Sequence, residues 1–135
     1  MTPGYGLAPA ERVRRRPDFE RAYNTGARVH GRFMTVFVAA NGTAVSRIGV
    51  AATRKLGSAV QRNRVKRVSR ELFRRHKVTA GLDIVIVPRR EMLDASFATL
   101  ESDYLAILER RTHERRRPQG RHSAGGRAAR PSSRV

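Results

Sequence analysis

Residues 54–77 read RKLGSAVQRNRVKRVSRELFRRHK, a stretch with ten Lys or Arg side chains and one acidic residue, Glu71. A block with so many like charges is usually a disordered, self-repelling tail. This block also carries apolar residues at helical spacing and begins with a Gly57-Ser58 turn. The pattern therefore predicts a helix, from Ser58 or Ala59 to His76, that docks on a core and presents a fixed array of cations to a polyanion.

The two sides of this expected helix differ in character. At about 100° per residue, the residues near Val65 form a docking face: Gln61, Val65, Val68, Ser69, Leu72 and His76. The opposite face holds Asn63, Lys66, Arg67, Arg70 and Arg74, with Arg62, Arg64 and Arg75 beside it. A solvated face, the alternative interpretation, usually mixes charges of both signs. The near-absence of acids here favours nucleic acid as the partner.

The whole chain is strongly basic. It has 135 residues, enough for one domain, with a net charge of +18 and a pI of about 11.9. Such a balance favours nucleic acid or an anionic membrane surface. Only Lys55, Lys66 and Lys77 are lysines, and Arg binds phosphate in a bidentate manner, which favours nucleic acid. An Arg-rich genomic composition is the alternative cause of the bias.

Several protein classes are disfavoured. The absence of cysteine excludes disulfides and thiolate metal sites. No apolar run approaches the roughly 18 residues of a membrane span, and the first residues have no apolar segment typical of a secretory signal. We therefore expect a cytoplasmic protein that does not bind membranes.

Local patterns predict the remaining elements. A helix is expected from Pro17 to Gly26, and strands at 33–40, which is long enough to hide two strands or a bulge, and at 83–88. The Asn41-Gly42 pair predicts a hairpin whose returning strand is 46–53. A last helix, about 94–111, begins at Asp94 or Ser96. Its expected core face is Phe97, Leu100, Tyr104, Leu105 and Leu108.

These elements predict three regions. Residues 1–11 are expected to be a flexible N-terminus, 12–111 an α/β domain, and 112–135 a disordered basic tail, because the tail lacks apolar bulk. The pattern alone gives the order α-β-β-α-β-α and a small two-layer domain.

No motif for protein-based catalysis is present. The acids form no catalytic pair, and the P-loop, GxSxG and HExxH patterns are absent. The four His residues lack metal-ligand spacing. Aromatic residues beside the basic helix could belong to the core or could stack unpaired bases. Because strand side chains alternate, Thr35 and Phe37 share one face. If the other face of the sheet packs on helices, we expect Phe37 to be partly open.

The segment RIGVAATRKLGSAVQRNRVKRVSRELFRR at 47–75 resembles the signature of the bacterial ribonuclease P protein family. In that family a strand leads into a basic segment centred on Arg-Asn-Arg, here Arg62-Asn63-Arg64, and then into an Arg-bearing helix. The similarity extends to PDFERAYNTG at 17–26 and to 83–88, and covers about residues 12–110.

The resemblance implies a fold and a role. The fold is an α/β (α+β) two-layer sandwich of the ribosomal-protein-S5-domain-2-like type, in the order α-β-β-β-α-β-α with a left-handed βαβ crossover. In this family a catalytic RNA removes the 5′ leader of precursor tRNA with Mg²⁺ held mainly by the RNA, and the protein supplies no catalytic residue. The expected partners are ribonuclease P RNA and precursor tRNA, with one protein per RNA subunit.

The resemblance also implies site residues. Those for RNA binding are Arg54, Lys55, Arg62, Asn63, Arg64, Lys66, Arg67 and Arg70, and the basic face of the expected helix adds Arg74. A leader-binding cleft is expected at Phe19, Tyr23, Thr35, Phe37 and Lys55. Two alternatives remain: a ribosomal or chaperone-like RNA binder without a leader cleft, and a DNA-binding helix module. The second is disfavoured because no helix-turn-helix partner is evident.

Overall fold

The computed structural model of the protein describes residues 9–78 and 81–116, with side chains through residue 111. The elements in chain order are η2 (Pro9–Glu11), α1 (Arg16–Thr25), β1 (Ala27–His30), β2 (Met34–Ala40), β3 (Arg47–Val50), α2 (Ala59–Arg75), β4 (Leu82–Pro88), η3 (Arg90–Asp94) and α3 (Phe97–Arg116). Apart from the two short 3-10 turns, this is the α-β-β-β-α-β-α order that the resemblance implies, so the mixed α/β class is confirmed.

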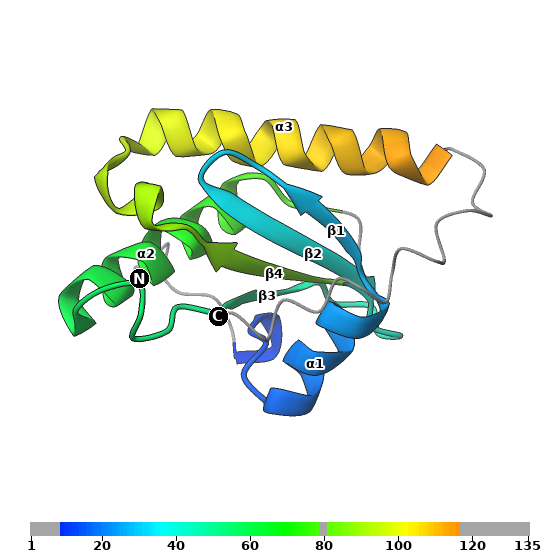
Figure 1. Cartoon of the computed structure of the whole chain (residues 1–135). Helices are drawn as coiled ribbons and strands as arrows, with labels where there is room; N and C mark the ends of the chain where they lie inside the picture. Colours follow the sequence, from blue (N-terminus) through cyan, green and yellow to red (C-terminus); the bar gives the residue numbers. More distant parts are fainter. Residues whose placement is uncertain (1–8, 79–80, 117–135) are drawn as a thin grey trace.

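The four strands form one mixed sheet in the order β1-β2-β4-β3 (Figure 1). Strand β2 is antiparallel to β1 and β4, whereas β3 runs parallel to β4. The expected hairpin between 33–40 and 46–53 is therefore wrong, because β4 lies between the two strands. The Asn41 turn is tied to β4 instead, through its backbone N–H to the Gly81 carbonyl at 2.9 Å and its side-chain amide to Asp83 at 2.8 Å. The unit β3–α2–β4 is the expected parallel crossover, and its left-handed sense stays a prediction.

The sheet is covered on both faces. The side chains of Met34, Val36 and Val38 enter the larger core, which the sheet forms with α2 and α3. The alternating residues Phe37 and Ala39 enter a smaller core under α1. Figure 1 shows α1 and α3 on opposite sides of the sheet. The sheet with α2 and α3 forms the sandwich, and α1 adds partial cover to the second face.

The edge strand β1 is the element that the residue pattern alone did not place. The second strand suspected within 33–40 lies at 27–30 instead, where only Val29 is buried. Gly26 permits the tight passage from α1 into β1. A Cβ on Gly26 would lie 2.6 Å from the Ala22 carbonyl oxygen and 2.9 Å from that of Val38, so no larger residue fits.

The last helix differs in detail from the prediction. Ser96 caps it, since its hydroxyl accepts the Thr99 N–H at 3.2 Å. Ile107 is buried, whereas Leu105, expected in the core, is 40% exposed. Helix α3 continues to Arg116, past the expected end at 111. The rest of the expected tail, 117–135, and residues 1–8 of the expected flexible N-terminus lie outside the described residues.

Candidate nucleic-acid interface

The beginning of α2 is fixed by a capping box one residue before Arg62. The Ser58 hydroxyl accepts the Gln61 N–H at 3.2 Å, and the Gln61 side chain accepts the Ser58 N–H at 2.8 Å. This arrangement satisfies two N–H groups that a helix start otherwise leaves unpaired. A Cβ on Gly57 would meet the end of the Gln61 side chain, so a larger residue there would displace that amide from the capping box. The Arg-Asn-Arg segment therefore begins from a rigid turn.

Seven of the nine residues expected to bind RNA lie along α2, with Arg54 and Lys55 in the turn before it. The side chains of Arg54, Lys55, Asn63, Arg64 and Arg67 are exposed, and those of Arg62, Lys66, Arg70 and Arg74 are half-buried. The expected docking side is confirmed at Val65, Ser69 and Leu72, and Phe73 is a further buried residue that was missed. All nine of these side chains, the Arg and Lys cations and the amide of Asn63, therefore remain accessible to a partner.

Some of these cations are already engaged within the protein. Arg62 donates to the Gly57 carbonyl at 3.0 Å and Arg64 to the Leu93 carbonyl at 2.8 Å. Neither bond cancels the positive charge, because a carbonyl is neutral. Arg74 alone among the nine pairs with a described carboxylate, that of Glu71, at 2.6 Å. The remaining charge is therefore available for phosphate contacts.

A groove of about 600 Å³ separates α1 from the segment that enters α2. It is lined by Arg14, Arg16, Phe19, Glu20, Tyr23, Asn24, Val50, Ala51, Ala52, Thr53 and Lys66. Phe19 and Tyr23, both expected in the leader cleft, come from the same face of α1 with ring centroids 6.5 Å apart. The groove thus brings two aromatic rings together with Arg14, Arg16 and Lys66.

The structure corrects the expected position of Phe37. Its side chain is 1% exposed rather than partly open, because Tyr23 packs edge-on against it with ring centroids 5.0 Å apart. Thr35, on the same sheet face, is also buried, and its hydroxyl lies 3.1 Å from His30 Nδ1. Phe37 packs beneath Tyr23 in the smaller core, and neither Phe37 nor Thr35 lines the groove.

Lys55 lies at a smaller neighbouring cavity of about 240 Å³. This cavity also contacts Val87, Pro88 and Arg90, and shares Ala51 and Thr53 with the larger groove. The two hollows therefore adjoin along the backbone that follows β3. Arg14 and Arg16 of the groove and Arg90 of the smaller cavity were missed from the sequence. For the first two, the run of Arg residues within 12–16 was a visible signal.

Charge in the larger groove is mainly positive. Glu20 is the one acid among its lining residues, and it lies 3.9 Å from Arg16 at the surface. Burial raises the pKa of Tyr23 above its usual value, so the phenol stays neutral at physiological pH and can donate a hydrogen bond. A neutral aromatic wall with a cationic rim suits an unpaired, negatively charged strand.

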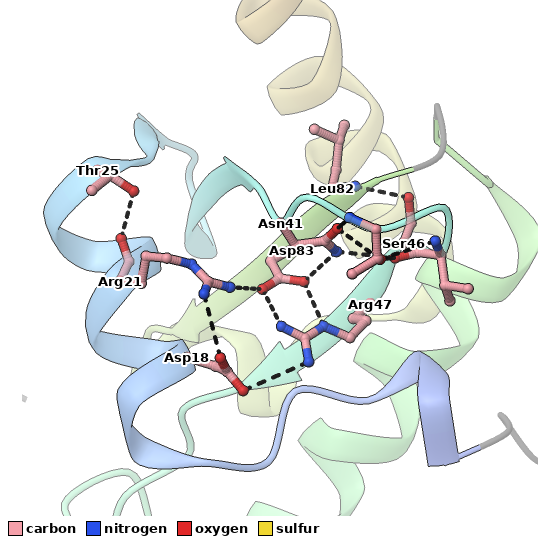
Figure 2. Close-up of polar contacts among 10 residues, drawn as sticks. Asp18, Arg21, Thr25, Asn41, Ser46, Arg47, Leu82 and Asp83 are labelled. Carbon is pink, nitrogen blue, oxygen red and sulfur yellow. Dashed lines mark hydrogen bonds and ion pairs between the residues drawn. The ribbon is translucent and has the colours of Figure 1, made fainter.

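Helix α1 is held on the sheet by a buried carboxylate, Asp83 (Figure 2). Arg47 donates to it twice at 2.7 Å, Arg21 of α1 at 3.0 Å and Asn41 at 2.8 Å. Burial alone would raise the pKa of Asp83, but the hydrogen bonds from Arg47 and Asn41 outweigh it and hold the pKa below its usual value. This cage fixes the helix that carries Phe19 and Tyr23.

Among residues 9–78 and 81–111, no three His, Asp or Glu side chains are placed to hold a metal ion. The described part of the chain also contains no helix whose length and apolar character would let it span a bilayer. The side chains that could contact a partner at this surface are mainly the guanidinium groups of Arg, the ammonium groups of Lys and aromatic rings.

Comparison with known proteins agrees with this chemistry. The profile of the family described as Ribonuclease P matches residues 7–112. The Ribonuclease P protein component of Oleidesulfovibrio alaskensis is 46% identical over 107 residues, covering 76% of this chain and 82% of that protein. The corresponding Thermotoga maritima protein is 36% identical over 106 residues, covering 74% and 91%.

Solved structures give the same result. The RNase P protein from Thermotoga maritima superposes with a TM-score of 0.67 at 36% identity, covering 74% of this chain and 96% of that one. A Staphylococcus aureus RNase P protein mutant superposes with a TM-score of 0.70 at 30% identity, covering 76% and 89%.

Proposed function

Because the chain belongs to the family of bacterial ribonuclease P protein components, we propose that it binds the ribonuclease P RNA and the 5′ leader of precursor tRNA. In doing so it promotes the Mg²⁺-dependent cleavage that forms the mature tRNA 5′ end. The family places the chain in a tRNA-processing ribonucleoprotein with an RNA partner. Recognition of the leader is our extension from the geometry.

The groove between α1 and α2 is the observation that carries the leader assignment. It is about 600 Å³ in volume and joins Phe19 and Tyr23 with three cations. Aromatic rings stack on unpaired bases without reading sequence, and the cations contact the phosphates between them. A folded duplex offers no splayed bases to such a groove. The groove therefore suits the single-stranded leader better than the tRNA body.

The outer side of α2 suits the RNA subunit. Its Arg and Lys side chains project from a helix whose first turn is locked by the Ser58 capping box. Cations held in fixed positions lose little freedom when phosphates bind, and the release of counterions then favours binding. Because Lys66 is the α2 residue that lines the groove, the other cations of α2 remain for the RNA subunit, and one protein can contact both RNAs at once.

We assign no step of bond cleavage to the protein. Among residues 9–78 and 81–111, no three acidic or His side chains converge. Mg²⁺ is proposed to be held mainly by the RNA, whose phosphates are oxygen ligands of the kind that it prefers, and the protein's contribution is to bind and orient the leader. We place this activity in the cytoplasm, with one protein per RNA subunit.

A ribosomal-type RNA binder of the same fold is the competing function. It would bind folded RNA without preferring a 5′ extension, and nothing in it would require an aromatic groove. Cleavage of precursor tRNA by a bacterial ribonuclease P RNA, measured at low Mg²⁺ with and without the protein, separates the two. We expect the protein to stimulate cleavage and to be inactive alone. Tight RNA binding without stimulation would favour the ribosomal-type function.

A further inference from the structure

A second cavity, of about 330 Å³, is bounded by α2, by the first residue of α3 and by Arg12. It is lined by Arg12, Arg67, Val68, Arg70, Glu71, Arg74 and Phe97. None of these residues lines the groove of Phe19 and Tyr23. The cavity therefore combines four guanidinium groups with two apolar side chains at a separate place on the surface.

The positive charge of this cavity is not balanced from within. Glu71 is its one acid, and both carboxylate oxygens already accept bonds from Arg74 and Arg75, at 2.6–3.1 Å. Among the described residues, no carboxylate pairs with Arg12, Arg67 or Arg70. The pKa of Arg70 is lowered by burial and by the nearby charge of Arg12. Two adjacent guanidinium groups without a carboxylate favour an external anion.

Arg12 gives independent support for an anion. Its Nε is buried and has no hydrogen-bond partner among the described residues. Its backbone is fixed beside β3 by a bridge to Ile48, so the side chain has limited freedom to turn away. A buried donor without an acceptor is costly. A phosphate oxygen in the cavity would supply the missing acceptor.

The apolar side of the cavity indicates that the ligand is more than a phosphate. Val68 and Phe97 are half-buried, and Arg75 Cζ lies 4.8 Å from the centroid of the Phe97 ring. Inorganic phosphate gains nothing from an apolar wall, whereas an unstacked nucleobase buries its faces against apolar groups and guanidinium planes. The cavity therefore combines cations for a phosphate with an apolar wall for a base, the two features that a nucleotide requires.

We propose that this cavity binds a single unstacked nucleotide of the RNA subunit, with its base against Val68 and Phe97 and its phosphate near Arg12 and Arg70. The inference rests on the proposed function for the identity of the RNA. The chemistry of the cavity itself can be tested without that RNA. An acidic peptide is the other anionic polymer that the cations would attract, and it lacks a planar group for the apolar wall.

The first test titrates the full chain with AMP, ribose 5-phosphate and inorganic phosphate in separate NMR experiments. We expect AMP to shift the Val68 methyl and Phe97 ring resonances saturably, and to bind at least about tenfold more tightly than ribose 5-phosphate, as stacking of one base implies. Equal affinities for AMP and phosphate would overturn the proposal, as would the lack of a saturable shift. Tighter binding of an oligo-glutamate peptide than of AMP at these resonances would also overturn it.

The second test uses Arg12→Gln with Arg70→Gln, and Arg32→Gln, which removes one positive charge elsewhere on the surface, as a control. Arg32 is exposed in the β1–β2 turn and lines neither cavity. We expect the double variant to weaken binding of bacterial ribonuclease P RNA at least about tenfold and to make the salt slope shallower by about one to two. The control should bind as the wild type does. The preference for precursor over mature tRNA should persist, because the leader groove is unchanged.

The two proposals fail in different ways. If the wild type stimulates cleavage but the double variant binds RNA as tightly as Arg32→Gln, the nucleotide cavity is wrong and the proposed function stands. If the wild type does not stimulate cleavage while AMP still saturates the cavity and Arg70→Gln abolishes that binding, the nucleotide site stands and the proposed function is wrong.

Discussion

Tyr23 lies over Phe37 with the two ring centroids 5.0 Å apart and the planes at 68°, so one aromatic ring reaches the groove and the other supports it from below. Tyr23 is half-buried, whereas Phe37 is 1% exposed. The pair joins α1 to the middle of β2. A substitution at Tyr23, in the groove wall, should therefore weaken recognition of the leader. A substitution at Phe37, beneath it, should lower the stability of the fold.

Phe19→Ala tests the groove wall. Phe19 shares the groove with Tyr23 and belongs only to the edge of the small core. We expect precursor tRNA to bind about tenfold more weakly, since one stacked base contributes about 1–3 kcal/mol. Mature tRNA should bind as before. Equilibrium binding of both RNAs to the holoenzyme, with Leu105→Ala on the exposed side of α3 as the control, measures the difference. Equal weakening of both RNAs would remove Phe19 from leader recognition.

Phe37→Ala tests the buried support beneath Tyr23. A buried Phe replaced by Ala costs about 3–5 kcal/mol through lost burial and the cavity that remains. We therefore expect a large fall in the urea midpoint of unfolding, with the leader preference retained in whatever fraction stays folded. A variant of normal stability that has lost leader preference would show that Phe37 contacts the RNA directly.

The Arg-Asn-Arg segment should determine assembly with the RNA subunit. Arg62→Ala with Arg64→Ala removes two accessible cations whose described partners are carbonyls. We expect weaker binding of ribonuclease P RNA and a salt slope shallower by about one to two. Filter binding across a salt series measures the slope, and Arg32→Gln is again the control. An identical slope in the variant and the wild type would mean that these two side chains do not neutralise phosphates.

Elements with strong local patterns could be predicted from the sequence, and the topology of the sheet could not. Helix α2 follows from its capping residues and apolar period, and α3 from its cap at Ser96. The Asn41-Gly42 turn predicted a hairpin because a turn signal carries no information about β4, which is about forty residues away in the chain and binds Asn41 through Asp83. Only the family resemblance supplied the additional strand.

The site was predicted unevenly for the same reason. The cations of α2 are adjacent in sequence, so their shared face could be worked out from helical geometry. The groove, by contrast, joins Phe19 of α1 to Thr53 and Lys66, which are distant in sequence. Burial of Phe37 depends on where Tyr23 packs, which no strand pattern specifies. The nucleotide cavity likewise depends on the approach of Arg12 and Phe97 to α2.

Ser58 offers a test of whether a fixed helix start matters for RNA binding. Ser58→Ala removes the acceptor for the Gln61 N–H, and we expect a loss of about 1 kcal/mol in the free energy of unfolding. Ser58→Asp restores an acceptor but adds a negative charge beside Arg62, so stability should recover while RNA affinity falls. Ser58→Thr should preserve both. Normal RNA binding by the Asp variant would place this turn outside the interface.

Asp83→Asn tests the cage that holds α1. Asp83 is fully buried, and the change leaves Arg47 and Arg21 without their shared carboxylate, so we expect a loss of about 3 kcal/mol at pH 7. The pKa of Asp83 is lower in the folded protein than in the unfolded chain. Its ionised carboxylate therefore contributes fully to the free energy of unfolding above the unfolded pKa of about 3.9, and this contribution disappears as the pH falls through the lower folded pKa. Urea unfolding of the wild type and of Asp83→Asn should therefore give a difference in the free energy of unfolding that is constant from pH 7 to 5 and narrows below pH 4. Asp18→Asn, whose pairs with Arg21 and Arg47 are 3.5 and 3.6 Å long, should cost about 1 kcal/mol or less. A gap for Asp83→Asn that persists undiminished below its folded pKa would mean that packing, and not the charge, holds α1 in place.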